Sequence, residues 1–451
     1  MEMTLDRKRA LARELLRRNQ PPDATNPVAT SIARKAAEIP EAFYRFEEFP
    51  GYKNLIAQRD TMQQLGVRNP YFNCHGDVSR DTIEIEGRAY INYSGYNYLG
   101  LSGDAEVNAE VIEAVERYGT SVSASRIVSG EIPLHRDLEA ELAEFHGVAE
   151  AVVFVSGYGT NVSTLGHLFG PKDLLLHDSL IHNSAMTGCK LSGARRMPFP
   201  HNDCAALEKL LEEHRADHER VCIITEGVFS MDGDIPDLPQ LIELKRKHKA
   251  LLMVDEAHSA GTLGSTGRGV AEHFGIDPRD VDIWMGTLSK SFASCGGYIA
   301  GCAALILNLR YSAPGGVLYS VGMTPANAAA ALASLRKLKR VPERLERLRK
   351  NSSLFVSLAK QEGLNTGSSH DSPVVPVILS NSIHCLKLAH RLFDEGVNVQ
   401  PMLHPAVPEE ATRLRFFITA LHTPEQIEFS VRTTARLLRE IRAEPISTEN
   451  R

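Results

Sequence analysis

The chain has 451 residues, of which 43% are hydrophobic and 24% are charged, so a sizeable globular core is expected. A formal net charge of −6 argues against a protein that binds nucleic acid through bulk positive charge. No run of about 18 apolar residues occurs, so we expect neither a transmembrane helix nor a membrane partner. Seven cysteines without a CxxC pair argue against a disulfide framework or a bound metal, and favour a reducing, cytoplasmic location.

The first 94 residues are expected to form an N-terminal extension that ends in a β-hairpin. Residues 5–19 (LDRKRALARELLRRN) have the pattern of a basic amphipathic helix, either a solvated surface helix or a docking site for an acidic partner. Asp6 and Glu14 argue against mitochondrial targeting. The hairpin is predicted over residues 82–93 (TIEIEGRAYINY), with Glu86-Gly87 at the turn.

Residues 95–324 are predicted to form a large α/β domain, because short apolar runs alternate with amphipathic helices. Strands are expected at 151–156, 173–178, 220–227, 250–257 and 281–286. Helices are expected at 104–118, 134–146, 207–215 and 238–249. This alternation predicts a mostly parallel sheet with helices on both faces.

Residues 325–451 are predicted to form a smaller C-terminal α+β domain. Helices are expected over 325–363, 382–394 and 424–442. Strands are expected over 374–379, 396–402 and 413–420.

Polar residues follow three strands of the predicted sheet, where ligands of open α/β sheets bind. The first strand ends in SGYGTN (156–161), in which two glycines before a helix N-terminus can cradle a phosphate. The strand over 250–254 ends in DEAHS (255–259), and the strand over 281–286 ends in TLSK (287–290).

Lys290 lies among small residues, with no other charge between Asp282 and Arg310. A lysine in apolar surroundings has a lowered pKa and can act as a nucleophile. Each motif alone has an ordinary explanation: a turn, a structural lysine, or a helicase box, although the chain lacks the GxxxxGK[ST] loop of a helicase. Together, a phosphate cradle, an acid, a histidine and a lysine indicate pyridoxal 5′-phosphate (PLP) as the cofactor.

The order of these motifs resembles the α-oxoamine synthase family of fold-type I PLP enzymes. Its members include 8-amino-7-oxononanoate synthase, 2-amino-3-ketobutyrate ligase, serine palmitoyltransferase and 5-aminolevulinate synthase. The resemblance covers roughly residues 90–440. It is carried by NYLGLSG (97–103), SRIVSGEIPLHRDLEAELAEF (125–145), SGYGTN, HDSLIHNS (177–184), TEGVFSMDGD (225–234), VDEAHSAGTLGSTGRG (254–269), TLSKSFASCGGY (287–298) and RLRFFITALHTPEQ (413–426).

The resemblance implies catalytic roles for four residues. Lys290 would hold the cofactor aldehyde covalently and later act as the base. Asp255 would pair with the pyridine nitrogen, and His258 would bond the ring hydroxyl or a substrate carbonyl. His182 would stack on the pyridine ring, although it could instead cap the helix that begins near Asn183.

The resemblance also implies binding roles. Cofactor phosphate contacts are expected from Gly157, Tyr158 and Thr287. Ser230 and Glu226 would line the pocket. Arg415 would grip the substrate carboxylate and Asn97 would lie near the substrate. Arg415 alternates with Arg413 along a strand, so a surface ion pair is the other interpretation of Arg415.

The reaction that the resemblance implies is a decarboxylative condensation of an amino acid with an acyl thioester, which gives an α-amino ketone, CO₂ and a free thiol. The alternatives are an aminotransferase or amino-acid lyase of the same fold, and a non-catalytic partner subunit. The presence of both Lys290 and Asp255 argues against the last alternative. Relatives are homodimers with the site at the subunit interface, so a homodimer is expected.

Two segments depart from the family pattern. Several members are glycine-rich where this chain has GTSVSAS (119–125), near the substrate mouth. In YSVGMTP (319–325), Val321 stands where members often place a hydroxyl that reaches the neighbouring subunit's phosphate. Other segments resemble synthase domains of polyketide assembly lines, which suggests an acyl carrier protein as the donor; the basic 5–19 segment would suit such an acidic partner.

Overall fold

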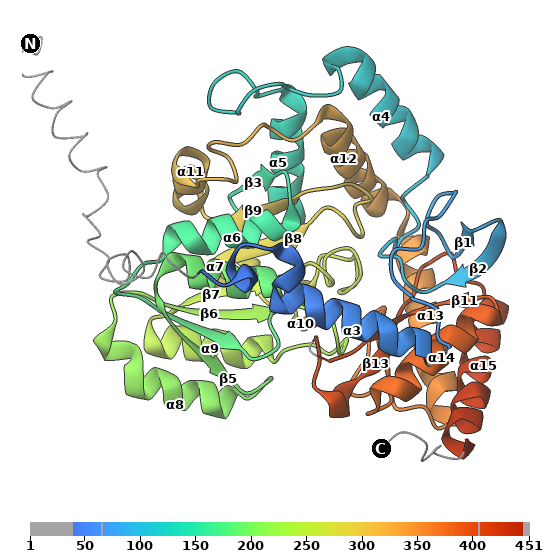
Figure 1. The fold of residues 1–451 in the computed structure, drawn as a ribbon. Helices are drawn as coiled ribbons and strands as arrows, with labels where there is room; N and C mark the ends of the chain where they lie inside the picture. Colours follow the sequence, from blue (N-terminus) through green and yellow to red (C-terminus); the bar gives the residue numbers. More distant parts are fainter. Residues whose placement is uncertain (1–38, 65, 405, 445–451) are drawn as a thin grey trace, which may run out of the picture. The chain divides into compact units, whose positions relative to one another are not determined.

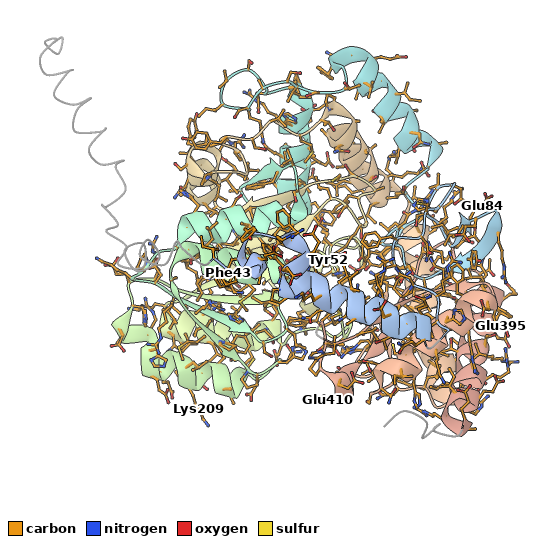
Figure 2. All side chains as sticks on the ribbon, in the orientation of Figure 1. Phe43, Tyr52, Glu84, Lys209, Glu395 and Glu410 are labelled. Carbon is orange, nitrogen blue, oxygen red and sulfur yellow. The ribbon has the colours of Figure 1, made fainter. Side chains whose placement is uncertain are left out.

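The computed structural model describes residues 39–64, 66–404 and 406–444. These residues fall into two units, with the boundary between Asn69 and Pro70. In the first unit, two 3-10 turns (Glu41–Phe43 and Phe46–Glu48) precede helix α3 (Pro50–Gln64). α3 buries none of its residues, and Phe43 and Tyr52 are exposed (Figure 2). The helix predicted over residues 5–19 lies outside the described residues.

The second unit contains a seven-stranded sheet with the order β3-β9-β8-β7-β6-β4-β5 (Figure 1). Its strands are β3 (Glu150–Phe154), β4 (Leu174–Asp178), β5 (Arg195–Phe199), β6 (Val221–Glu226), β7 (Leu251–Asp255), β8 (Ile283–Thr287) and β9 (Gly297–Gly301). β9 runs antiparallel to both neighbours, and the remaining pairs are parallel. The predicted α/β fold with a mostly parallel sheet is therefore confirmed.

Both faces of this sheet are buried, which explains why its central strands are continuous apolar runs. Successive residues alternate between two cores: Val152 and Met253 face one side, Val153 and Leu252 the other. The first core is completed by α6 (Gly157–Leu168), α7 (Asn183–Ser192) and α11 (Ala303–Ser312). The second core is completed by α5 (Pro133–His146), α8 (Cys204–His214), α9 (Leu238–His248), α10 (Val270–Phe274) and α12 (Pro325–Arg340), and α4 (Ala105–Tyr118) packs on α12.

Sequence patterning missed two strands of the sheet. β5 (RRMPF) is an edge strand whose residues are mostly exposed, so it shows no apolar run. β9 (GYIAG) is flanked by glycines, and a Cβ at Gly297 would lie 2.5 Å from Thr160 Oγ1. The close approach of α6 to β9 therefore requires glycine at this position.

The C-terminal region has its own core between the antiparallel sheet β10-β13-β12 and three helices. Its elements are α13 (Pro342–Gln361), β10 (Val374–Ile378), α14 (Ser382–Asp394), β11 (Val397–Asn398), β12 (Gln400–Met402), β13 (Arg413–Phe417) and α15 (Pro424–Ala443). The helix predicted over 325–363 is divided into α12 and α13 at Val341, because Pro342 cannot continue a helix.

The predicted hairpin is confirmed as β1 (Thr82–Ile85) and β2 (Arg88–Asn92). Glu86 and Gly87 have φ of 53° and 77°, as a primed hairpin turn requires. β2 also pairs in parallel with β11, so the segment predicted as one strand over 396–402 contributes to two sheets. The predicted domain boundaries at 94/95 and 324/325 stay a prediction.

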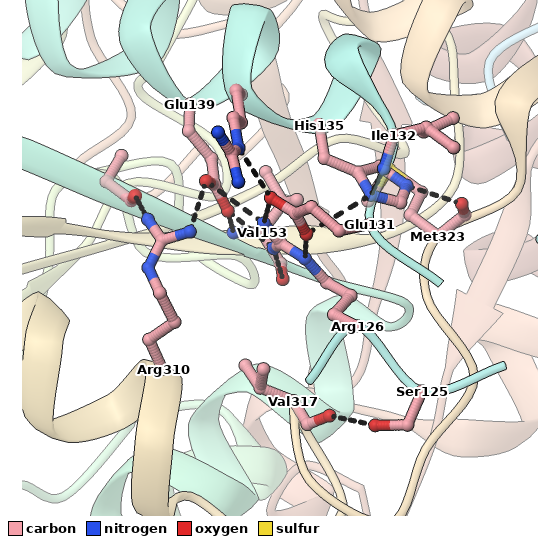
Figure 3. A network of polar contacts seen from close by, with 12 residues as sticks. Ser125, Arg126, Glu131, Ile132, His135, Glu139, Val153, Arg310, Val317 and Met323 are labelled. Carbon is pink, nitrogen blue, oxygen red and sulfur yellow. Dashed lines mark hydrogen bonds and ion pairs between the residues drawn. The ribbon is translucent and has the colours of Figure 1, made fainter. Parts of the chain in front are cut away.

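A buried ionic network fixes the segment before α5 (Figure 3). The Arg126 guanidinium donates to the carboxylates of Glu131 and Glu139 and is 8% exposed. Glu139 also pairs with Arg310 of α11, at 3.0 Å. His135 Nε2 lies 2.7 Å from the Met323 carbonyl oxygen, which joins the segment before α12 to the same network. Within the described residues, no helix is both long and apolar enough to cross a bilayer.

Candidate active site

A cavity of about 400 Å³ lies at the carboxyl ends of the parallel strands. Ten of the residues predicted for the site line it: Gly157, Tyr158, His182, Glu226, Ser230, Asp255, His258, Thr287, Lys290 and Arg415. The strands that end here are neighbours in the sheet, so residues far apart in sequence meet at one edge.

Lys290 lies three residues beyond the end of β8 and contacts His258. Its Nζ is 2.8 Å from His258 Nε2, and His258 Nδ1 is 2.7 Å from the hydroxyl oxygen of Tyr98. Burial lowers the pKa of Lys290 to about 8, although the negative charges of Asp255 and Glu226 oppose this shift. Near pH 7 about a tenth of the Lys290 side chains are therefore neutral amines, a far larger share than for a lysine in water, and the neutral amine is the nucleophile.

Asp255 ends β7 and is 5% exposed. Its Oδ2 accepts a hydrogen bond of 2.9 Å from Asn161 Nδ2, and its Oδ1 accepts one of 3.0 Å from the Ala257 N–H. Both carboxyl oxygens of Asp255 therefore accept hydrogen bonds from N–H groups. Sequence reasoning missed Asn161; its signal was the spacing of four residues from Gly157, which places both on one face of α6.

Glu226 is the second buried acid of the cavity, and it pairs in register with Asp255 on the neighbouring strand. Burial, reinforced by the charge of Asp255, raises the pKa of Glu226 to about 8. Its Oε2 accepts from the Ser230 N–H at 3.1 Å, whereas its buried Oε1 has no hydrogen-bond partner among the described residues. At neutral pH this carboxyl is mostly protonated and can donate.

His182 fits both interpretations that the sequence left open, and its stacking on the pyridine ring stays a prediction. It is the N-cap of α7, with Nδ1 2.7 Å from Ser184 Oγ, and its ring also lines the cavity. Burial is the main cause of its lowered pKa, and the positive charges of Lys290 and Arg415 add to the shift. The imidazole is therefore uncharged, as suits stacking on an aromatic ring.

The sequence predicts a phosphate cradle at the start of α6, and the local geometry fits this prediction. Ser156 caps the helix, and a Cβ at Gly157 would lie 2.6 Å from Thr287 Oγ1, so only glycine fits beside this hydroxyl. Ser289 Oγ lies 2.9 Å from Thr287 Oγ1 and adds a second hydroxyl. The Tyr158 hydroxyl donates to Asn183 Oδ1 and joins α6 to α7. Free N–H groups, two hydroxyls and a missing Cβ fit a phosphate, so this donor set fits PLP.

The two arginines of β13 have different environments. Arg413 is 5% exposed and ion-pairs with Asp232, so it is neither at the surface nor in the cavity. Arg415 lines the cavity, and its Nη1 donates to the Ser230 carbonyl at 2.8 Å. Its Nε is buried and has no hydrogen-bond partner in the part of the chain that the structure describes. Arg415 thus retains an unused donor for an anion, as binding of a carboxylate requires.

Asn97 is the one predicted residue that does not line the cavity. Its Nδ2 donates to the carbonyls of Ser79 and Ser102, and its Oδ1 accepts from the Ser102 N–H. These bonds use the amide inside its own loop, so a substrate role for Asn97 stays a prediction. Its neighbour Tyr96 lines the cavity instead, and the centre of the Tyr96 ring lies 5.6 Å from Lys290 Nζ.

A charged cluster beside the cavity also escaped the sequence analysis. His201 Nδ1 lies 2.9 Å from Asp178, and its Nε2 lies 2.8 Å from Asp234. Burial alone would lower the pKa of His201, but hydrogen bonds to these carboxylates outweigh it and raise the pKa to about 10. The imidazolium links the end of β4 to the loop that carries Ser230, whose carbonyl holds Arg415.

Comparisons with known proteins agree with this geometry. The family model described as aminotransferase class I and II matches residues 88–432. A relative named 8-amino-7-oxononanoate synthase from Symbiobacterium thermophilum is 39% identical over 387 residues, which cover 86% of this chain and 98% of the relative. A relative of the same name from Geobacter sulfurreducens is 41% identical over 362 residues, which cover 80% of this chain and 91% of the relative.

Solved structures give the same result. The serine palmitoyltransferase of Sphingomonas wittichii has a TM-score of 0.83 and 32% identity, over 88% of this chain and 99% of that chain. The serine palmitoyltransferase of S. paucimobilis, solved with bound PLP, has a TM-score of 0.83 and 30% identity, over 87% of this chain and 99% of that chain.

The fold and the family match define the class: the chain belongs to the aminotransferase class I and II family, the PLP-dependent transferases of fold type I. Its relatives and structural neighbours are named 8-amino-7-oxononanoate synthase and serine palmitoyltransferase. Within the class, the chain therefore belongs to the α-oxoamine synthases.

The His201 cluster predicts a specific pH dependence of stability. Its folded-state pKa of about 10 exceeds the unfolded value, so its stabilisation is complete below about pH 6.5 and is lost as pH rises through 10. The free energy of unfolding of His201→Gln should fall furthest below that of the wild type near pH 6, and the gap should narrow towards pH 10 in urea titrations. His167→Gln is the control, because His167 bonds the neutral amide of Asn308. A gap for His201→Gln that does not change with pH would contradict the prediction.

Proposed function

We propose that this chain condenses an amino acid with an acyl thioester, with loss of CO₂ and release of the thiol, and that the cavity residues named above carry the reaction. One arrangement supports this function most directly. Lys290, Asp255 and Gly157 line the same cavity as Arg415, whose Nε has no hydrogen-bond partner within residues 39–64, 66–404 and 406–444. A cofactor site and a carboxylate site therefore adjoin.

Three elements would hold the cofactor. The start of α6, with Thr287, would bind its phosphate, and the Asp255 carboxylate would bind the pyridine nitrogen. The neutral amine of Lys290 would bind its aldehyde covalently. When bound, PLP supplies a protonated pyridine ring that withdraws electrons from the amino acid's Cα.

The remaining residues would orient the substrate and move protons. Arg415 would hold the carboxylate of the amino acid, so that the correct bond of Cα stands perpendicular to the cofactor ring. Lys290, once displaced by the substrate amine, would remove the Cα proton. His258 would hold the amine of Lys290 close to that proton, through the contact of 2.8 Å. The neutral carboxyl of Glu226 would donate a hydrogen bond into the cavity.

Product analysis separates this function from that of an aminotransferase or lyase. We expect holoenzyme supplied with glycine, alanine or serine and an acyl-CoA to release free thiol and CO₂. Formation of a 2-oxo acid without thiol would contradict the proposal. Lys290→Ala should abolish the absorbance of covalently bound cofactor and lower turnover by at least about a thousandfold. The surface variant Lys172→Ala should change neither quantity.

We also propose that the chain forms a homodimer through the segments around residues 125–128 and 317–322. These segments are joined by hydrogen bonds from Ser125 Oγ to the Val317 carbonyl and from the Gly322 N–H to the Ala124 carbonyl. They expose several large apolar side chains, namely Ile127, Val128, Tyr319 and Val321. The Arg126 network makes the base of this patch rigid (Figure 3). An exposed apolar patch on a rigid base suits a permanent protein interface.

A charge in this patch should weaken the dimer. We expect Val128→Asp to raise the dimer dissociation constant at least about tenfold in sedimentation equilibrium, because an aspartate would be buried without a partner. Ile383→Asp is the matched control, since Ile383 is exposed on α14 outside the patch. Equal dissociation constants for the two variants would contradict the proposed interface.

We propose an acyl carrier protein as the acyl donor and the cytoplasm as the location. The basic residues 5–19 suit an acidic carrier, because complementary charge accelerates association. All seven cysteines are free thiols, which suits a reducing compartment.

Carrier dependence is testable through the N-terminal charges. The full chain should have a higher kcat/KM for an acyl carrier donor than for acyl-CoA. Removal of residues 1–20, or the double substitution Arg17→Glu and Arg18→Glu, should lower only the carrier value, by about tenfold at low salt. Lys209→Glu, a charge reversal on the exposed surface of α8, is the control (Figure 2). An identical donor preference in all these proteins would exclude the carrier role of residues 5–19.

A further inference from the structure

Tyr98 lies at the end of a three-residue chain of contacts that reaches the reactive lysine. Its hydroxyl oxygen is 2.7 Å from His258 Nδ1, and His258 Nε2 is 2.8 Å from Lys290 Nζ. Tyr98 has no exposed surface, and His258 is 5% exposed. Phe417 stacks on the His258 ring with an interplanar angle of 11°, so the ring is held in the plane that both contacts need.

The state of His258 follows from its surroundings. Burial holds the pKa of His258 well below its usual range, and the positive charges of Lys290 and Arg415 add to this effect. The ring is therefore neutral and carries one hydrogen, on Nδ1 or on Nε2. Burial also raises the pKa of Tyr98 well above its usual value, so its hydroxyl keeps its proton.

Hydrogen-bond accounting selects one of these tautomers. The only partner that the described residues offer the Tyr98 hydroxyl is His258 Nδ1. If Nδ1 carried the hydrogen, the buried phenol O–H would have no acceptor, which is unfavourable. If the phenol donates to Nδ1, every group is satisfied and the hydrogen of the ring lies on Nε2, facing Lys290.

The protonation state of Lys290 is coupled to this tautomer. A neutral amine has a lone pair and accepts a hydrogen bond from Nε2–H, whereas an ammonium group has only donors. We infer that Tyr98 is a positioning residue that fixes the hydrogen of His258 on Nε2 and thereby favours the neutral amine of Lys290. This inference rests on the proposed function only in that Lys290 is the residue that reacts with the cofactor aldehyde.

The other charged groups around the amine do not involve Tyr98. The Asp255 carboxylate favours the ammonium form of Lys290, as does Glu226 when it is ionised, and the Arg415 guanidinium opposes this form. His182 is neutral, and the Tyr96 ring lies 5.6 Å from Nζ. None of these groups is altered by Tyr98→Phe, so the substitution isolates the contribution of the hydroxyl.

The test measures the titration of Lys290 in cofactor-free protein. PLP is added over a range of pH, the adduct is reduced with borohydride, and the modified peptide that contains Lys290 is quantified. In the wild type, the rate of adduct formation at Lys290 should rise with pH, with its midpoint near pH 8. In Tyr98→Phe the midpoint should rise by about one unit, a tenfold change in proton affinity. An unchanged midpoint would overturn the inference.

The matched control is Tyr298→Phe. Tyr298 is also a fully buried tyrosine, its hydroxyl lies 2.8 Å from His146 Nε2, and it does not line the cavity. Loss of the Tyr298 hydroxyl should leave the midpoint pH of adduct formation at Lys290 unchanged. A shift as large as that of Tyr98→Phe would mean that loosening of the core explains both, and would overturn the inference.

A second measurement needs no variant and no cofactor. ¹⁵N NMR of histidine-labelled wild-type protein distinguishes the two neutral tautomers, and we expect His258 to carry its hydrogen on Nε2. Detection of the Nδ1–H form overturns the inference even if Tyr98→Phe does not fold. If Lys290 forms no adduct in the wild type, the proposed function fails, and the tautomer still decides the role of Tyr98.

Discussion

The parallel pairing of β7 with β8 is the constraint on which the site depends. Asp255 is the last residue of β7 and pairs in register with Met285 of β8. Lys290 lies five residues after Met285, just beyond the end of β8. The acid and the amine therefore reach the same end of the sheet. Because both strands are buried on both faces, a register shift would exchange the two cores of the sheet. The acid is therefore held by the core of the protein, and the lysine lies only three residues beyond a core strand.

Burial then determines the chemical state of the groups in the cavity. The same desolvation that lowers the pKa of Lys290 to about 8 also raises that of Glu226 to about 8. It keeps His182 and His258 neutral as well. Asp255 accepts hydrogen bonds from two N–H donors. The cavity thus combines this hydrogen-bonded acid with two neutral imidazoles and with an amine and a carboxyl group that both titrate near pH 8, an arrangement suited to proton transfer near neutral pH.

Supporting residues link this cavity to the rest of the second unit. The His201 cluster connects the end of β4 to the loop that holds Arg415, and Tyr98 connects the segment after the β1-β2 hairpin to His258 and Lys290. Each support is a histidine whose two ring nitrogens are both engaged; His201 is partly buried and His258 is buried. Burial lowers the pKa of both rings, and the two carboxylates outweigh this effect only at His201. His201 is therefore charged, whereas His258 stays neutral.

The sequence by itself determined the α/β architecture, most strand and helix positions, the cofactor class and ten cavity residues, because apolar periodicity and strand-end motifs are local signals. It could not reveal β5, whose residues are mostly exposed, or the glycine-flanked β9. Only the tertiary structure placed Asn161 on Asp255, Tyr98 on His258 and Arg413 on Asp232, and used the Asn97 amide within its own loop. These outcomes depend on contacts between residues distant in sequence, and on which hydrogen-bonding groups remain unused after folding.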